Sequence, residues 1–335
     1  MHNNHKVLLH LEEAIITSFP KYAHLFSIVG LDEEHILWIA KHFLLFHSYE
    51  YTSHKSIDLS GYDKSSLDNN PYPYSPYLEY YKIPLFIKSD EHIIEIIEEN
   101  IKKHFFICIN INISKLKIFD GFSLIHPVLI SGFDSKEKIF YVNDFYPPSS
   151  KYRREVINYN EITKGVLHNN NHDYCFLFRK KKVDIDIKKE IDLLVYIVRE
   201  NLVKILYGDF IPYNPYYFKT KNLINYRVGL KVYDEIVVDL FGYGKKAFHV
   251  LLDSKIITYE CLKVMEKYGK ITNLMLKNYL DLVLKVKIMR NLFMKLELLN
   301  KEKDFSLLVK MINEVKNYEK KLILDIIKHL FNQSN

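Results

Sequence analysis

The chain has 335 residues, of which 48% are hydrophobic and 26% are charged, and its formal net charge is +6. This length accommodates two domains with separate cores, and the composition is that of an ordinary globular protein. Because no basic helix or aromatic-basic module stands out, nucleic acid is not an expected partner. The N-terminus lacks the features of a secretion signal, and no apolar run reaches the roughly 18 residues of a membrane span, so the sequence predicts a cytoplasmic protein.

The first predicted element is an amphipathic helix over residues 8–19, because apolar residues recur there at helical spacing. Pro20 would end this helix, since proline lacks the amide hydrogen that a helix interior needs. Thr17 and Ser18 would then lie near its C-terminal end, where the helix dipole opposes an alkoxide. The sequence therefore disfavours both hydroxyls as nucleophiles.

Residues 32–47 predict a second amphipathic helix, which Asp32 would cap at its N-terminus. His35, His42 and His47 raise the question of a metal site. However, neither an HExxH spacing nor a companion set of carboxylates accompanies them. The sequence therefore predicts no metal and no cofactor, and it favours a structural or exposed role for these histidines.

Residues 48–84 form a long irregular stretch that is rich in tyrosine. Stretches of this length are usually functional or flexible loops. The tyrosines could line an apolar cleft with their polar tips, or they could pin a surface loop by packing. Both interpretations stay open for Tyr72, Tyr74, Tyr77, Tyr80 and Tyr81.

Residues 90–103 predict an amphipathic helix that leads into an antiparallel sheet. The predicted strands are residues 108–113, 124–133, 139–144, 155–159 and 174–178. A polar turn at residues 135–138 joins the second and third strands into a hairpin, which brings His126 near Asp144. A carboxylate there could hold an imidazole in one tautomer, as a catalytic base requires. Spacing alone favours the plainer interpretation, which is a strand-end histidine and a turn-forming aspartate.

From about residue 185 the pattern becomes helical, with candidate helices at residues 186–206, 226–241, 245–267, 271–299 and 303–331. In the fourth of these, one apolar row predicts a helix-packing face made of Leu280, Leu284, Ile288, Leu292 and Leu296. The sequence therefore predicts an α+β fold. An antiparallel sheet with helices would form a domain at residues 1–182, and an all-helical domain would follow at residues 183–335.

The hairpin segment carries a specific pattern. His126 opens a hydrophobic strand, Gly132-Phe133-Asp134 precedes a short turn, and Tyr141-Val142-Asn143-Asp144 follows it. This pattern resembles the His/Asp half of papain-like cysteine peptidases, and most closely the peptidase-like proteins related to bacteriocin leader processing. Within that group the whole chain is similar to the family of butirosin biosynthesis protein H. The resemblance implies a papain-like N-terminal domain and a helical C-terminal domain.

The resemblance also implies where a nucleophile would lie. In papain-like folds a cysteine at the N-terminus of the first long helix attacks, because the helix dipole lowers the pKa of its thiol. The family's His-Cys pattern matches His10-Leu11, so Leu11 stands where the nucleophilic cysteine is expected. A leucine cannot form a thioester. Further candidates for polar residues of the cleft are His10, Asn110 and Asn112.

The resemblance leaves two functions open. The first is a protein of natural-product biosynthesis that transfers an acyl group from a carrier protein to an amine, with His126 as general base and Asp144 orienting it. The second is an inactive papain-like scaffold that binds a carrier protein, a peptide or an acyl chain.

An acyl or peptidyl carrier protein is the expected partner. The basic run at residues 179–182 could attract such an acidic protein, or it could be a solvated linker between domains. A peptidase is disfavoured, because hydrolysis also needs the missing thiolate. The cysteines of the chain are expected to be buried, reduced thiols: Cys108, Cys175 and Cys261.

Overall fold

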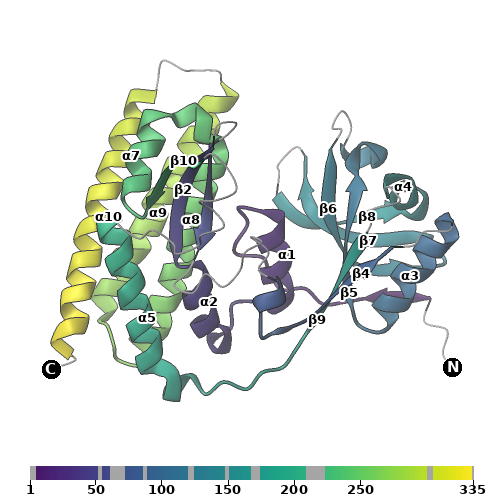
Figure 1. The fold of residues 1–335 in the computed structure, drawn as a ribbon, viewed down its shortest axis with the longest axis horizontal. Coiled ribbons are helices and arrows are strands. Elements are labelled where there is room, and N and C mark those ends of the chain that lie inside the picture. Colours follow the sequence, from purple (N-terminus) through teal and green to yellow (C-terminus); the bar gives the residue numbers. More distant parts are fainter. Residues whose placement is uncertain are drawn as a thin grey trace. The chain divides into compact units, whose positions relative to one another are not determined.

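The computed structural model describes residues 5–51, 55–60, 72–85, 89–119, 124–147, 151–166, 174–208, 223–299 and 305–333. The chain forms two compact units, each assembled from two stretches of sequence. Unit 1 comprises Met1–Gly30 and Asn70–Val183, and unit 2 comprises Leu31–Asn69 and Asp184–Asn335. Unit 1 is rich in antiparallel strands and unit 2 is rich in helices, so the predicted α+β class is confirmed (Figure 1).

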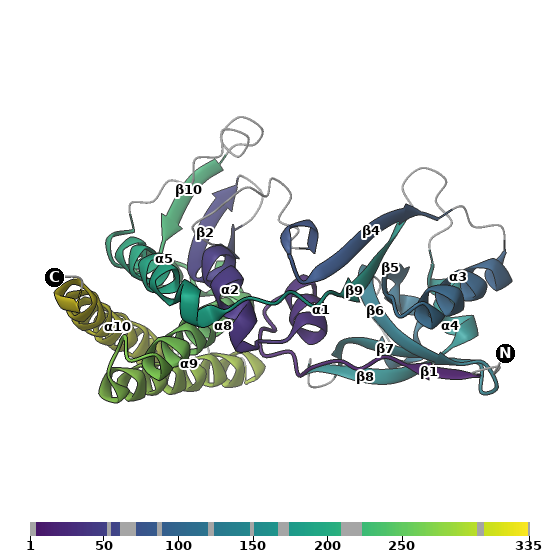
Figure 2. The ribbon, with the colours of Figure 1, turned by 90° about the horizontal axis from the view of Figure 1, so that it is seen from below.

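Unit 1 is built on a seven-stranded antiparallel sheet with the strand order β4-β9-β5-β6-β7-β8, in which β1 pairs with the C-terminal end of β6. The strands are β1 (Lys6–Leu8), β4 (Leu78–Pro84), β5 (Phe106–Asn112), β6 (Ile125–Asp134), β7 (Ile139–Tyr146), β8 (Lys151–Asn158) and β9 (Tyr174–Lys180). Because β6 bonds to β1, β5 and β7, it is the central strand of unit 1 (Figure 2).

The close approach of β1 explains a glycine in β6. Gly132 pairs with Leu8, and a Cβ atom on Gly132 would lie 2.5 Å from the backbone oxygen of Val7. No side chain can be accommodated at that distance, so the pairing of β1 with β6 requires glycine at this position.

In the part of unit 1 that the structure describes, the helices are α1 (Pro20–Val29), α3 (Asp90–Lys102) and α4 (Tyr159–Gly165). Helix α1 contacts β6, β7 and β9, whereas α3 and α4 contact each other and β5. The side chain of Ser89 caps α3 by accepting a hydrogen bond from the His92 amide at 3.3 Å. Helix α3 follows the prediction for residues 90–103, with Ile93, Ile97 and Ile101 buried at helical spacing.

The predicted helix over residues 8–19 is wrong. Strand β1 ends at Leu8, the first residue of this run, the chain then continues without a helix, and α1 begins with Pro20 in its first turn. The Leu9 amide donates to the Ser131 carbonyl at 2.8 Å, so the start of the run is held to β6. Proline is favoured at the first helical position, where no amide hydrogen is needed, and it therefore starts a helix here instead of ending one.

Unit 2 contains a sheet as well as helices, so the prediction of an all-helical domain is wrong. Its strands pair in the order β10-β2-β3, with bounds β2 (Leu45–Tyr51), β3 (Lys55–Ser60) and β10 (Leu223–Val228). Its helices are α2 (Ile36–Phe43), α5 (Ile187–Tyr207), α7 (Lys231–Val238), α8 (Leu240–Lys267), α9 (Asn273–Leu298) and α10 (Phe305–Gln333). Among the helices that the structure describes, none combines the length and hydropathy needed to cross a lipid bilayer.

Three sequence predictions missed this sheet. The helix predicted at residues 32–47 ends in β2, the helix predicted at 226–241 begins in β10, and the irregular stretch at 48–84 holds β3 and part of β2, together with all of β4 of the other sheet. Strands β2 and β10 pair antiparallel although they are distant in sequence. Strand formation depends on such packing more than on local preference, so periodicity did not reveal it.

The first predicted domain, residues 1–182, is interrupted because residues 31–69 belong to unit 2. Helix α2 explains this grouping, since it is apolar on nearly all sides and contacts α5 and α8. A helix of that kind must be surrounded by a core. The second boundary, between Val183 and Asp184, lies one residue from the predicted one.

Candidate functional site

His126 and Asp144 meet in unit 1. The Nε2 atom of His126 lies 3.0 Å from Oδ1 of Asp144. The His126 side chain is 20% exposed, whereas the Asp144 side chain is fully buried. The prediction that these side chains approach each other across the hairpin is therefore confirmed, and the imidazole retains access to solvent.

The strand register explains why they meet. Strands β6 and β7 pair Leu129 with Asn143, and one further step places Asp144 opposite Val128. His126 is two residues before Val128 and thus on the same face of the sheet. Diagonal neighbours of this kind lie within reach of a long side chain such as histidine.

The two nitrogens of His126 have different surroundings. Because a carboxylate oxygen accepts, Nε2 donates to Asp144, and in the neutral form of the ring Nδ1 carries the lone pair. Nδ1 makes no hydrogen bond with any residue that the structure describes. The nitrogen that could accept a proton from a reacting group is therefore Nδ1.

The Asp144 carboxylate is held asymmetrically. Oδ1 accepts from His126 and also from the Phe145 amide at 2.8 Å. Oδ2 is buried and has no hydrogen-bond partner among the described residues. A buried acceptor without a partner is costly, so this carboxylate resembles a functional group more than a structural one.

A second histidine lies beside the dyad, and sequence reasoning missed it. His24 of α1 is fully buried, with Nε2 3.4 Å from the Pro127 carbonyl and Nδ1 3.0 Å from the Tyr152 hydroxyl. The carbonyl can only accept, so Nε2 donates and Nδ1 accepts from Tyr152. His24 thus links α1 to the residue that follows His126.

The electrostatics of this cluster follow from burial. Burial lowers the pKa of His24 to about 4, and the negative charge of Asp144 opposes this shift. Burial also raises the pKa of Tyr152 far above its usual range, so its hydroxyl keeps the proton that it donates. In the sequence, His24 stands within an apolar stretch that follows Pro20. A prediction that began the helix at Pro20 would therefore have indicated a buried histidine.

The nucleophile position expected from the family pattern does not exist in this fold. Leu11 lies in the non-helical run between β1 and α1, so no helix dipole acts on it. His10 is exposed, with Nε2 3.5 Å from Glu12 Oε1. The prediction that a helix containing Leu11 points its N-terminus toward His126 is therefore wrong.

Because the first helix starts at Pro20, two hydroxyl residues lie at the opposite end of a helix from the one predicted. Thr17 and Ser18 lie just before the N-terminus of α1, and not near the C-terminus of a helix. The positive end of a helix dipole favours negative charge on nearby oxygen atoms. The reason for disfavouring them therefore no longer applies.

The thiols offer no replacement nucleophile, because all three cysteines are buried. Burial raises the pKa of Cys108 strongly, and the charge of Asp144 adds to this effect. Burial raises the pKa of Cys175 to about 11 and that of Cys261 further still. At neutral pH none of these side chains is a reactive thiolate.

The two asparagines predicted for the cleft lie on the wrong face of the sheet. Strand β5 pairs Ile111 with His126, so alternation directs Asn110 and Asn112 to the opposite face. The Asn112 side chain instead accepts from the Ser114 amide at 3.1 Å.

The tyrosines of the long stretch are mainly packing residues. The Tyr72 ring lies 4.5 Å from that of Phe178, and the Tyr80 ring stacks on Phe176 at 5.6 Å between ring centroids. Tyr77 is fully buried and Tyr81 is exposed. The side chain of Tyr74 lies outside the described residues.

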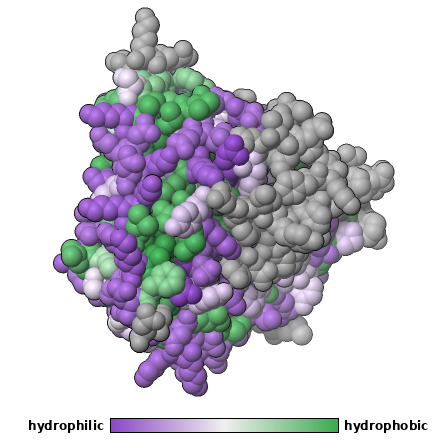
Figure 3. Space-filling model, turned by 60° about the vertical axis from the view of Figure 1, so that its left-hand side comes forward, coloured by the Kyte–Doolittle hydropathy of each residue, from purple (hydrophilic) through white to green (hydrophobic). Residues whose placement is uncertain are grey.

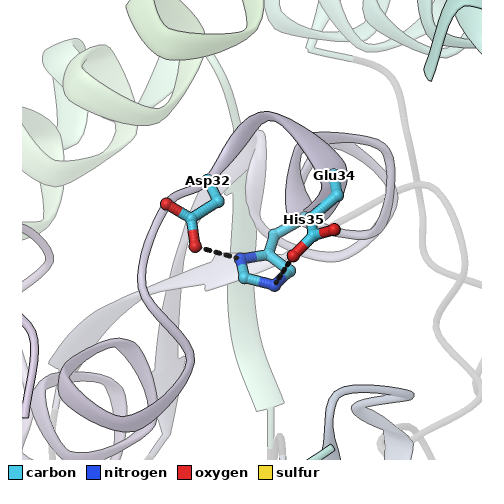
Figure 4. Close-up of side chains that lie close together, drawn as sticks. All are labelled: Asp32, Glu34 and His35. Atoms are coloured by element: carbon cyan, nitrogen blue, oxygen red, sulfur yellow. Dashed lines mark ion pairs between the residues drawn. The ribbon is translucent and has the colours of Figure 1, made fainter. Parts of the chain in front are cut away.

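A group with the composition of a metal site lies in unit 2, formed by Asp32, Glu34 and His35 (Figure 4). Asp32 approaches Nδ1 of His35 at 3.9 Å, and Glu34 approaches Nε2 at 3.6 Å. One ligand atom from each of the three residues lies within 4.8 Å of the other two, so the group could hold a metal ion through one nitrogen of His35. Two carboxylates therefore accompany His35, and each also lies within ion-pair distance of a different ring nitrogen.

The chain matches no model of a known protein family, and no curated protein is significantly similar to it.

The basic run at residues 179–182 is partly neutralised within unit 1, because Arg179 pairs with Glu79 and Lys180 lies 4.0 Å from Glu12. The site is thus defined by its geometry, which consists of a His–Asp dyad and a buried histidine anchoring the neighbouring helix.

Proposed function

We propose that unit 1 is a papain-like module of the kind found in the butirosin biosynthesis protein H family, acting in carrier-dependent acyl transfer. The observation that carries this proposal is the 3.0 Å contact between His126 Nε2 and Asp144 Oδ1, with the imidazole partly exposed and the carboxylate buried. A carboxylate that fixes one tautomer of an imidazole is the usual arrangement of a general base.

The proposed step needs no enzyme thiol. As the amine nitrogen bonds to the carbonyl carbon of a carrier-bound thioester, His126 Nδ1 accepts a proton from that nitrogen. The carbon–sulfur bond then breaks, and the leaving carrier thiolate takes the proton from the imidazolium. Positioning both reactants beside the base supplies the remaining rate enhancement.

The second candidate is a scaffold that binds a carrier protein, a peptide or an acyl chain without turnover. Two observations favour it: Leu11 cannot be a nucleophile, and the cysteines are buried with raised pKa values. The polar dyad and the unpartnered Oδ2 of Asp144 argue against it, because a scaffold has no need of a costly buried carboxylate.

Incubation with an octanoyl-loaded acyl carrier protein and a primary amine tests the proposal, with intact-mass spectrometry following the carrier and the amide product. We expect octanoyl transfer that falls by about 10²–10⁴-fold in His126→Ala and is also reduced in Asp144→Asn. His329→Ala is the matched control, since it removes a histidine from α10 of unit 2, and it should not change the rate.

The outcomes separate the candidates. Transfer that is unchanged in His126→Ala contradicts a general base at this position. Binding of the carrier without transfer by the native protein supports the scaffold. An octanoyl adduct on Ser18 or Thr17 that depends on His126 replaces the direct route with a hydroxyl nucleophile at the start of α1.

A further inference from the structure

Helix α9 carries an apolar row that faces away from the core of unit 2. Leu280, Leu284 and Ile288 follow one another at four-residue spacing, so they share one side of the helix. Their exposed fractions are 38%, 48% and 58%. The sequence predicted this row as a packing face, and for these residues that prediction is wrong. The packing face of α9 is another row, with Tyr279, Val286, Met289 and Phe293 among its buried members.

A hollow lies beside this row, between α9 and α10. Its volume is 480 Å³, and its lining residues are Asp281, Lys285, Ile288, Met311, Glu314, Val315 and Tyr318. The Tyr318 hydroxyl donates to the Asn278 carbonyl at 3.3 Å, and Lys285 Nζ lies 5.6 Å from the centre of its ring. These contacts hold the wall of the hollow in place. We refer to the exposed row and the hollow together as the α9 groove.

Exposed apolar side chains are also visible between hydrophilic ones in the space-filling view of Figure 3. Single exposed apolar residues are ordinary on a protein surface, whereas a row beside a hollow marks an interaction site. Spacing of four residues along one helix is the pattern by which helices pack into each other's grooves. The geometry of the α9 groove therefore suits a helical occupant.

The charges around the α9 groove define the character of that occupant. Lys277, Lys287 and Lys295 are each seven residues from a member of the exposed row, so they lie on the same side of the helix. Lys285 lines the hollow and is also exposed. The carboxylates of Asp281 and Glu314 lie at the same groove as these four lysines. The rim of the α9 groove therefore carries more positive than negative charge.

We propose that the α9 groove binds an amphipathic helix of a partner protein whose apolar face is bordered by Asp and Glu residues. The apolar face of the partner helix would cover Leu284 and Ile288, and its acidic border would contact the lysines. This charge complementarity accelerates association with the partner and disfavours binding of proteins with other charge patterns. A second copy of this chain fits less well, because a two-fold contact through the α9 groove would bring the lysine rims together. A flat anionic membrane would leave the hollow unfilled.

Fluorescence anisotropy with a labelled peptide tests the proposal on the full chain. The probe is a synthetic amphipathic helix with leucine on one face and glutamate along both borders. Its controls are a scrambled peptide of the same composition and a peptide with lysine in place of glutamate. We expect saturable binding of the probe alone, weakened at least about tenfold by Leu284→Glu and weakened by Lys287→Glu.

Matched variants guard against misfolding. Leu193→Glu replaces another exposed leucine, on α5, with 39% exposure against 48% for Leu284, and should leave binding unchanged. Lys188→Glu is the corresponding control for charge. His126→Ala should bind the probe normally, so loss of acyl transfer and loss of docking are distinguishable. Circular dichroism confirms that each variant keeps its helices.

Four results would overturn the proposal. Equal binding of the scrambled peptide, or normal binding by Leu284→Glu, removes the α9 groove as the site. Sedimentation could detect self-association of the native chain that is lost in Leu284→Glu. That result assigns the α9 groove to a second copy of the chain. The native chain could float with vesicles that contain phosphatidylserine, in a manner that depends on Leu284, and fail to bind the peptide. That result assigns the α9 groove to a membrane.

Discussion

Two hydrogen-bonded pairs of ionisable side chains, one in each unit, differ in their access to solvent. In unit 1, His126 and Asp144 lie 3.0 Å apart, and the imidazole reaches the surface. In unit 2, Lys255 Nζ lies 2.5 Å from Glu319 Oε1, and both side chains are fully enclosed. The remaining carboxylate oxygen of Glu319 accepts from the Tyr233 hydroxyl at 2.6 Å.

The difference indicates a chemical role for the dyad of unit 1 and a structural role for the enclosed pair of unit 2. Lys255 Nζ also lies 3.9 Å from the centre of the Phe46 ring and 5.9 Å from that of Tyr233, so the partners of its cation come from β2, α7 and α10. Burial lowers the pKa of Lys255, and the charge of Glu319 opposes that shift. No reactant can enter such a pair, which therefore holds α8 and α10 in one arrangement. The dyad of unit 1 is poorer in partners but keeps one nitrogen for a ligand.

The largest effect is expected from Glu319→Ala. It leaves the Lys255 ammonium buried without its counter-charge, which costs about 3–5 kcal/mol in the free energy of unfolding. Urea unfolding followed by circular dichroism measures this loss. Glu314→Ala on the exposed face of α10 should stay within about 0.5 kcal/mol. Equal stability of the two variants would contradict a structural role for the enclosed pair.

The buried His24 should make unit 1 sensitive to acid. Its pKa falls from 6.5 to about 4 on folding, so below pH 6.5 the unfolded chain binds a proton that the folded chain does not. Stability from this group is complete above pH 6.5 and is lost as the pH falls toward 4, by about 3 kcal/mol. Urea unfolding at a series of pH values should show a flatter dependence in His24→Gln. An unchanged slope in that variant would argue against a neutral, enclosed His24.

Replacing both members of the enclosed pair should cost much less than removing one. Lys255→Met with Glu319→Leu keeps the volume and removes both desolvation penalties, so we expect a change in unfolding free energy within about 1 kcal/mol. The same urea titration measures it, and Glu319→Ala is the comparison. A double variant as unstable as the single one would mean that the Tyr233 hydrogen bond, and not the charge pair, dominates.

The smallest effect is expected from Leu11→Cys. Because Leu11 lies outside any helix, the new thiol gains no lowered pKa from a helix dipole. Its rate of alkylation by iodoacetamide should therefore be the same with His126 and with alanine at that position. Faster labelling that requires His126 would restore Leu11 to the site.

Much of the dyad was readable from local sequence. The β6–β7 hairpin follows from strand periodicity and a polar turn, in which the Asp134 side chain accepts from the Lys136 and Glu137 amides at 3.1 and 3.2 Å. Alternation along the two strands then brings His126 and Asp144 to one face. Helices α3, α9 and α10 were likewise visible, because each repeats its apolar residues over several turns.

Other features depend on contacts between segments that are distant in the chain. Pro20 starts a helix because the run before it is tied to β6, and β10 is a strand because β2 lies beside it. The apolar row at Leu280 faces outward because the other side of α9 packs on α8. Periodicity shows that a helix has an apolar face, but the choice between two such faces depends on which neighbour each one meets. The free energy of burial is a property of the assembled core, and no single segment of the sequence contains it.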